Sequence, residues 1–278
     1  MSPRAEGRSV DLAGLEVRGV SVGGIETCIE VPEYKLAFDL GRCSSSVVAI
    51  PTVLFTHAHM DHMGAIATHA ATRSLIGMRA PRYVVPPHAA GPLDRLFEAW
   101  RELDGSELPH ELISVAPGEE LALGRGRFAR PFRSIHRAPC QGYGIWSKRQ
   151  KLQARYRNSL PEVIAELRRD GVTVTDEIEY PELVFVGDTR IDVLEREEVV
   201  RKAKRLILEA TFIDDRVSIE DCRASGHVHL DEIAERADLF ENEAILLTHF
   251  SARYRPQDVR AALKRLPEVL RGRVQPFL

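Results

Sequence analysis

The sequence predicts an α/β fold, and three observations support this prediction. Strand-like apolar runs alternate with amphipathic helical segments along most of the 278 residues. Three of the runs end at a histidine or an aspartate, namely "VLFT" at His57, "LVFVG" at Asp188 and "ILLT" at His249. No low-complexity linker interrupts the alternation, so we expect one domain over residues 1–278. Strands separated by helices in this way indicate an α/β sandwich.

The first half opens with "TCIEVPEYKLAFDLG", which predicts two short strands around a turn at Pro32. Apolar residues in the segment after "THAHMDH" recur at helical spacing, and the later segment "AGPLDRLFEAWRELDG" carries an early proline and a glycine stop. We therefore expect strands within 27–41 and at 52–56, 82–86 and 127–136, and helices at 64–78 and 90–105.

The second half repeats the same alternation. Short β-branched and leucine-rich runs predict buried strands, and the longer charged segments between them have helical periodicity. We expect strands at 182–188, 205–211 and 244–250, and helices at 160–171, 229–241 and 255–266. Because ligands of α/β folds bind beyond the carboxyl ends of strands, the three strand ends at His57, Asp188 and His249 are expected to line one cleft.

Composition limits the classes of function. The chain is 44% hydrophobic and 28% charged, with a net charge of −3, which argues against a general polyanion binder. No apolar run approaches the roughly 18 residues of a membrane span, and "MSPRAEGRSVDLAG" has no apolar signal core, so we expect a cytoplasmic protein without a membrane partner. The four cysteines form no C-x-x-C pair, which favours free thiols.

The stretch "THAHMDH" predicts a metal site. It places His57, His59, Asp61 and His62 directly after a strand, and zinc in proteins is bound by imidazole nitrogen and carboxylate oxygen. Further candidate ligands follow the other strands, at His136, Asp188 and His249. The alternative is a chance cluster of structural histidines, which is the interpretation we prefer for three others, at His69, His88 and His110.

The order of these seven residues resembles the metallo-β-lactamase superfamily of binuclear metal hydrolases. The resemblance implies a four-layer αββα sandwich that binds two Zn²⁺ per subunit, with Mn²⁺ as another possible ion. It also implies that His57, His59 and His136 hold one ion, that Asp61, His62 and His249 hold the other, and that Asp188 bridges them.

Two further segments supply a candidate general acid. "ILEATF" places Glu209 at a strand end, and "GHVH" places His227 just before a helix. If Glu209 orients His227, this pair could protonate a leaving alkoxide. Structural alternatives are a salt bridge for Glu209 and a helix N-terminal contact for His227. With Asp61, these two are the candidate catalytic residues.

At this level the sequence resembles the tRNase Z family through "HRAPCQGYGI", "FVGDT", "EATF" with "GHVH", and "THFSARY". The stretches "SVGGIETCIEVPEYKLAFDLGRC" and "TRSLIGMRAPRYVVP" resemble its short plant forms in particular. The resemblance implies an endoribonuclease that removes the 3′ trailer from precursor tRNA, a homodimer, and a substrate-binding arm around 144–182. The chain departs from the common bacterial pattern in "GHVH", in Leu208 before the glutamate, and in a short arm without a Gly-Pro-rich stretch.

A basic segment supports an RNA substrate. Residues 125–157 contain ten Lys or Arg and no Asp or Glu, with aromatic residues between them, a pattern that suits phosphates and unpaired bases. The candidate substrate-binding residues are Arg137, Tyr143, Lys148, Arg149, Lys151, Arg253 and Arg255. The alternatives are a hydrolase of a small phosphodiester, lactone or thioester, and a non-catalytic RNA-binding module.

Overall fold

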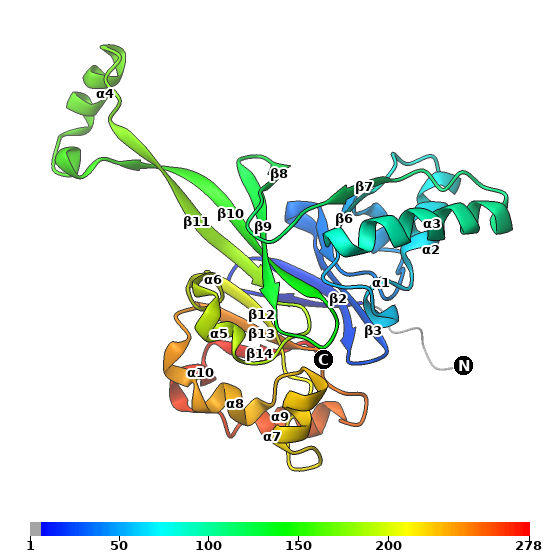
Figure 1. Ribbon diagram of the computed structural model, residues 1–278. Coiled ribbons are helices and arrows are strands. Elements are labelled where there is room, and N and C mark those ends of the chain that lie inside the picture. The colour runs from blue at the N-terminus through cyan, green and yellow to red at the C-terminus, as the bar shows by residue number, and fades with distance from the viewer. Residues whose placement is uncertain (1–6) are drawn as a thin grey trace.

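The computed structural model describes residues 7–278 and contains two seven-stranded sheets packed face to face (Figure 1). Three apolar clusters define the layers. One lies between the sheets and includes Phe38 and Phe185, whose rings stack at 4.8 Å. The other two lie between each sheet and the helices on its outer face. The predicted α/β, four-layer αββα sandwich is confirmed.

The first sheet is antiparallel at one edge and parallel at the other. Strands β1 to β4 pair antiparallel, and β4 to β7 pair parallel. The short strands β4 and β5 are buried throughout, as expected for parallel strands covered on both faces. The bounds are β1 Arg8–Asp11, β2 Glu16–Val22, β3 Glu26–Val31, β4 Leu36–Phe38, β5 Thr52–Leu54, β6 Arg82–Val85 and β7 Glu111–Ser114.

The second sheet has the same plan. Strands β8 to β11 are antiparallel, and β11 to β14 are parallel. The predicted strand 182–188 is the inner end of a longer β11. The bounds are β8 Leu121–Gly124, β9 Arg127–Ser134, β10 Cys140–Leu152, β11 Thr175–Phe185, β12 Arg205–Glu209, β13 Ala244–Thr248 and β14 Val274–Pro276.

Helices cover the outer face of each sheet (Figure 1). The first sheet carries α1 Met60–Met63, α2 Ile66–Leu75 and α3 Pro87–Asp104; the second carries α5 Val193–Arg196, α6 Glu198–Lys202, α7 Ile219–Ser225, α8 Leu230–Glu235, α9 Pro256–Leu263 and α10 Glu268–Arg271. The helix predicted at 229–241 ends at Glu235, because the chain then bends to bury Ala237 and Phe240 in the core. No helix among residues 7–278 is long and apolar enough to cross a membrane.

A two-stranded ribbon projects from the second sheet and ends in α4 Pro161–Arg169 (Figure 1). It is formed by the outer halves of β10 and β11, which pair from Trp146 with Pro181 to Leu152 with Thr175. The sequence does not predict β10 as a strand, because its outer half, "SKRQKL", is polar on both faces and lacks alternation. This ribbon occupies the segment expected to be the arm.

Candidate metal centre

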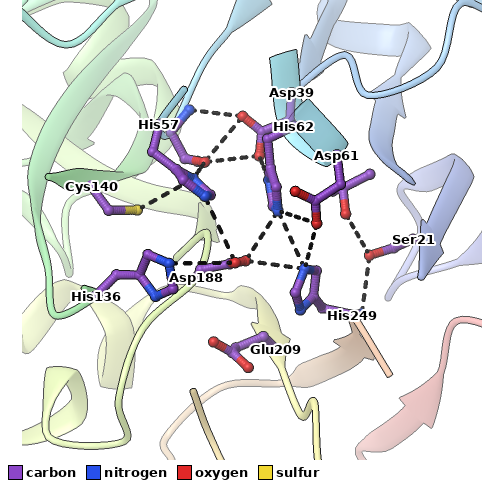
Figure 2. Close-up of polar contacts among 12 residues, drawn as sticks. Ser21, Asp39, His57, Asp61, His62, His136, Cys140, Asp188, Glu209 and His249 are labelled. Carbon is purple, nitrogen blue, oxygen red and sulfur yellow. Dashed lines mark hydrogen bonds and ion pairs between the residues drawn. The ribbon is translucent and has the colours of Figure 1, made fainter. Parts of the chain in front are cut away.

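The predicted ligands meet where the carboxyl ends of strands from both sheets converge (Figure 2). His57 follows β5, and α1 carries Asp61 and His62. His59 lies between β5 and α1, and the second sheet supplies the other three, because His136 follows β9, Asp188 follows β11, and His249 follows β13 directly. The structure therefore brings together all seven residues, including His59.

The ligand atoms form two groups that share Asp188 as their neighbour. In the first group, which comprises His57, His59, His136 and Asp188, all ligand atoms lie within 4.8 Å of one another. The second group is Asp61, His62 and His249. Asp188 lies between the groups, since its Oδ2 is 3.8 Å from Nε2 of His57 and its Oδ1 is 3.3 Å from Nε2 of His62.

The donor set fits divalent cations. Nε2 of His57 and Nε2 of His136 are buried without a hydrogen-bond partner, an arrangement that costs free energy in a protein core. In the second group, Nε2 of His62 lies 3.2 Å from Nε2 of His249. Imidazole nitrogens with inward lone pairs beside carboxylates are the environment that zinc and similar ions select.

The buried carboxylate of Asp39 holds two of the candidate ligand histidines in place, and the sequence did not single it out. Nδ1 of His62 donates to Asp39 at 2.8 Å. The Thr56 hydroxyl donates to the same carboxylate, at 2.9 Å from Oδ2, and its oxygen is 2.9 Å from Nδ1 of His57. Since Nδ1 carries the proton in both contacts, Nε2 is the nitrogen that each ring turns towards the centre.

The second sheet repeats this arrangement. The Thr211 hydroxyl donates to Glu209 at 2.5 Å, and its oxygen is 2.9 Å from Nδ1 of His249. Nδ1 of His136 donates to the Gly226 carbonyl at 2.9 Å, which again leaves Nε2 as the inward acceptor. A detectable signal existed for Asp39, which follows an apolar strand in "LAFD" just as the ligands follow theirs.

The electrostatics separate the histidines into neutral and charged forms. Burial, reinforced by the positive charge of His62, lowers the pKa of His57 to about 2, so His57 is neutral. Burial opposes a charge on His62, but Asp188 and Asp39 outweigh it and raise the pKa of His62 well above its usual range, so an ion bound by Nε2 of His62 would replace a proton there. Burial would raise the pKa of Asp188, yet the charges of His249 and His62 hold it well below normal.

The two residues of the candidate acid, Glu209 and His227, are in direct contact. Nδ1 of His227 lies 2.9 Å from Glu209, which also accepts from the backbone N–H groups of Thr189 and Val228. Burial would lower the pKa of His227, but the Glu209 carboxylate raises it to about 9. The neighbouring His229 is instead the N-cap of α8, where Nδ1 accepts from the backbone N–H of Asp231.

The predicted substrate-binding residues divide into three kinds. The prediction for Tyr143 is wrong, because its ring is fully buried between the sheets and its hydroxyl donates to the Phe55 carbonyl at 2.7 Å. Lys148 and Arg149 are exposed but form ion pairs with Glu177 and Glu182 of β11. Arg255 is also exposed and pairs with Asp258, whereas three exposed residues form no ion pair among residues 7–278: Arg137, Lys151 and Arg253.

In the fold, several positive charges of the basic segment 125–157 are neutralised by glutamates from outside it. Besides Lys148 and Arg149, Arg127 pairs with Glu33, and Arg130 pairs with Glu120 and Glu179. The acidic partners all lie outside residues 125–157, which is why the sequence of that segment contains no acid. The three histidines that we interpreted as structural lie outside the cluster, and His69 is buried against Tyr83.

Known proteins share both the sequence and the fold. Residues 39–250 match the family model of the β-lactamase superfamily domain. The chain is 40% identical to tRNase Z TRZ1 of Arabidopsis thaliana, over 96% of each chain, and 39% identical to the chloroplastic tRNase Z TRZ2 of the same plant, over 97% of this chain and 77% of that protein.

Solved structures agree with this fold. The short form of human tRNase Z superposes with a TM-score of 0.57 at 19% identity, covering 86% of this chain and 88% of the human one. The metallo-β-lactamase fold protein YhfI of Bacillus subtilis gives a TM-score of 0.59 at 18% identity, over 92% of this chain and 93% of that one. The superfamily domain and the His/Asp cluster together indicate a divalent metal. The chain belongs to the tRNase Z family of the β-lactamase superfamily.

Proposed function

We propose that this protein is a zinc-dependent endoribonuclease that removes the 3′ trailer from precursor tRNA. One observation carries the proposal: the Glu209–His227 pair, joined by the 2.9 Å contact, stands beside the two ligand groups that share Asp188. A candidate acid next to such a cluster suits cleavage of a phosphodiester whose leaving group is a poor one. The relatives named tRNase Z supply the class of substrate.

We propose two Zn²⁺ per subunit, with Mn²⁺ as a substitute. His57, His59 and His136 would hold one ion, and Asp61, His62 and His249 the other, with Asp188 shared. When bound, such ions act as Lewis acids and lower the pKa of a coordinated water from about 15.7 to about 7. The two partnerless Nε2 atoms, of His57 and His136, support this assignment.

The chain's own residues would orient the reaction and move its protons. Glu209 holds Nδ1 of His227, so Nε2 is the nitrogen left to donate a proton to the departing 3′ oxygen of the tRNA. Burial opposes the charge on Asp61, but the neighbouring His249, whose Nε2 is 3.7 Å from Oδ2, and the positive charge of His62 lower its pKa. Ionised Asp61 can therefore orient the attacking water as well as bind a metal.

The projecting ribbon with α4, within residues 144–182, is our proposal for the arm that binds the tRNA body. Its strand β10 carries Lys148, Arg149 and Lys151, which are all exposed. Phosphates would replace Glu177 and Glu182 as partners of the first two, and Lys151 makes no ion pair among residues 7–278. Nearer the centre, exposed Arg137, Arg253 and Arg255 would contact the RNA close to the cleavage site.

We further propose that the protein acts as a homodimer. An apolar groove of about 360 Å³ lies between α1, α2 and α3, and its walls include Met60, which is 78% exposed, Leu96 and Trp100. Large exposed apolar side chains gathered in one groove indicate an interaction surface, and a second copy of the chain is the partner we infer. Trp100→Glu should reduce the mass measured by light scattering to that of one chain; a monomeric parent protein would refute the dimer.

For the compartment we propose the cytoplasm. Its support is that Cys28, Cys43, Cys140 and Cys222 are all free thiols, as is usual where glutathione keeps thiols reduced.

The test pairs cleavage with binding. With zinc present at low salt, the parent protein should cut a trailer-bearing precursor tRNA, while His62→Ala should lose cleavage and keep most of its RNA affinity. Full activity of His62→Ala would contradict the site. Turnover of a simple bis-aryl phosphodiester without turnover of precursor tRNA would favour a small-substrate hydrolase instead.

A further inference from the structure

A cavity of about 420 Å³ opens beside the metal centre on the side of His136, which forms part of its wall. This volume falls within the roughly 300–1,000 Å³ typical of pockets for small ligands. Three arginines line it: Arg133 from β9, Arg137 from the following loop, and Arg196 from the end of α5. Two of them, Arg133 and Arg196, were not among the residues predicted to bind substrate.

The three guanidinium groups are not engaged by carboxylates in the part of the chain that the structure describes. Within residues 7–278 none of them forms an ion pair or a side-chain hydrogen bond, and no Asp or Glu lines the cavity. Other arginines of the same strand differ, since Arg127 and Arg130 are both paired with glutamates. Three cations gathered in one concave site without an acid favour an anionic ligand.

The rest of the wall suits the uncharged part of a nucleotide. Pro86, Pro87, Pro117 and Pro139 line the cavity, and proline rings fix the backbone around them and present an apolar surface. Exposed His88 adds a ring that can stack or donate a hydrogen bond. The cavity therefore combines a cationic cluster with rigid apolar walls next to a metal ligand.

We propose that this cavity binds one nucleotide of the single-stranded RNA next to the scissile bond, with Arg133, Arg137 and Arg196 holding its phosphate. This inference rests on the proposed function, and it names the nucleotide of the substrate that would bind beside the metal centre. Because His136 belongs to both the cavity and the cluster, a nucleotide bound here would set which phosphodiester reaches the metals. The contact would raise affinity and fix the position of cleavage.

The test compares two double variants with equal loss of charge. Arg133→Gln/Arg196→Gln removes two cations of the cavity, and Arg260→Gln/Lys264→Gln removes two exposed cations of the α9 region. Binding of a short fluorescein-labelled oligouridylate is measured by anisotropy in EDTA, where cleavage does not occur. We expect the cavity variant to raise the Kd roughly tenfold and to reduce the slope of log Kd against log salt by about 1.4, while the control changes little.

Cleavage then locates the nucleotide. If the cavity variant raises KM for precursors with single-nucleotide and long trailers alike, the bound nucleotide belongs to the tRNA; if only for long trailers, it belongs to the trailer. Unchanged bis-aryl phosphodiester turnover would show that the variant is folded. Equal Kd values for the cavity variant and the parent would overturn the proposal. Failure of the proposed function would appear separately, as a parent protein that binds RNA without cutting precursor tRNA.

Discussion

The carboxylate of Glu209 lies 2.9 Å from Nδ1 of His227 and 2.5 Å from the hydroxyl of Thr211, whose oxygen is in turn 2.9 Å from Nδ1 of the candidate ligand His249. One buried carboxylate thus orients both a candidate acid and a candidate ligand. Because two backbone N–H groups, of Thr189 and Val228, also donate to Glu209, its position is fixed by the fold.

The first prediction concerns His227. We expect His227→Ala to lower kcat for precursor tRNA by about a hundredfold or more, because the departing alkoxide would leave unprotonated. KM should change little. Hydrolysis of a bis-aryl phosphodiester, whose leaving group is more acidic, should suffer far less. Equal losses on the two substrates would indicate that His227 supports the fold or the metals instead of donating a proton.

A second prediction tests Asp39, the carboxylate that orients the candidate ligands His57 and His62. Asp39→Ala should weaken metal binding about 10- to 100-fold, because His62 loses its 2.8 Å partner and Thr56 can no longer anchor His57. Competition with a chelator measures the affinity. Glu30→Gln is the matched control, since Glu30 is a buried carboxylate paired with Arg18 away from the centre. Equal affinities in both variants would refute this role for Asp39.

The sequence predicted the ligands better than their support. His249 follows its strand directly, His57 and Asp188 lie three residues beyond the ends of theirs, and the convergence of strand ends is a general property of α/β folds. Thr56 and Thr211 could not be singled out, because a threonine that relays a hydrogen bond resembles any other strand threonine in sequence. The error at Tyr143 has a similar origin, since an aromatic ring among basic residues suits RNA stacking and core packing equally well.

The strands of the fold likewise divide into those that the sequence predicted and those that it did not. Parallel strands such as β5 and β13 are buried throughout and mostly apolar and were predicted, whereas the outer half of β10 is polar and gains its pairing from β11. The charge balance also depends on the fold, because Arg130 and Arg149 receive their glutamates from other strands. Unpaired cations therefore say more about RNA than the count of basic residues does.

A third prediction concerns acid stability and His69. Burial lowers the pKa of His69 from 6.5 to about 4, with Nδ1 2.9 Å from the Tyr83 hydroxyl and Nε2 3.2 Å from the Val47 carbonyl. The unfolded chain binds this proton more readily, so the stability present above the unfolded pKa is lost as pH falls from 6.5 towards 4. Between about pH 7 and about pH 5 the loss should be about 2 kcal/mol.

Urea unfolding in EDTA checks this contribution by comparison with His69→Gln. The variant should start less stable but lose about 2 kcal/mol less over the same pH interval, because every other histidine titrates in both proteins. Parallel pH curves for the two proteins would contradict the assignment.

A fourth prediction concerns metal removal. Chelation should abolish cleavage and lower the Tm by about 10 °C, because ions at a thousandfold excess over Kd stabilise the folded state by about 4 kcal/mol. The buried Nε2 atoms of His57 and His136 would then have no partner among residues 7–278. Added zinc should restore both properties. A Tm that is insensitive to EDTA, in a protein shown to be metal-free afterwards, would contradict the metal assignment.

The most direct test of the account is to map, at single-nucleotide resolution, the products that this protein forms from a trailer-bearing precursor tRNA, beside an Asp188→Ala variant. We predict one cut after the discriminator nucleotide, leaving a 3′ hydroxyl on the tRNA and a 5′ phosphate on the trailer, and no cut by the variant. Absence of that cut with the zinc-loaded parent protein, or an equal cut by Asp188→Ala, would contradict the account.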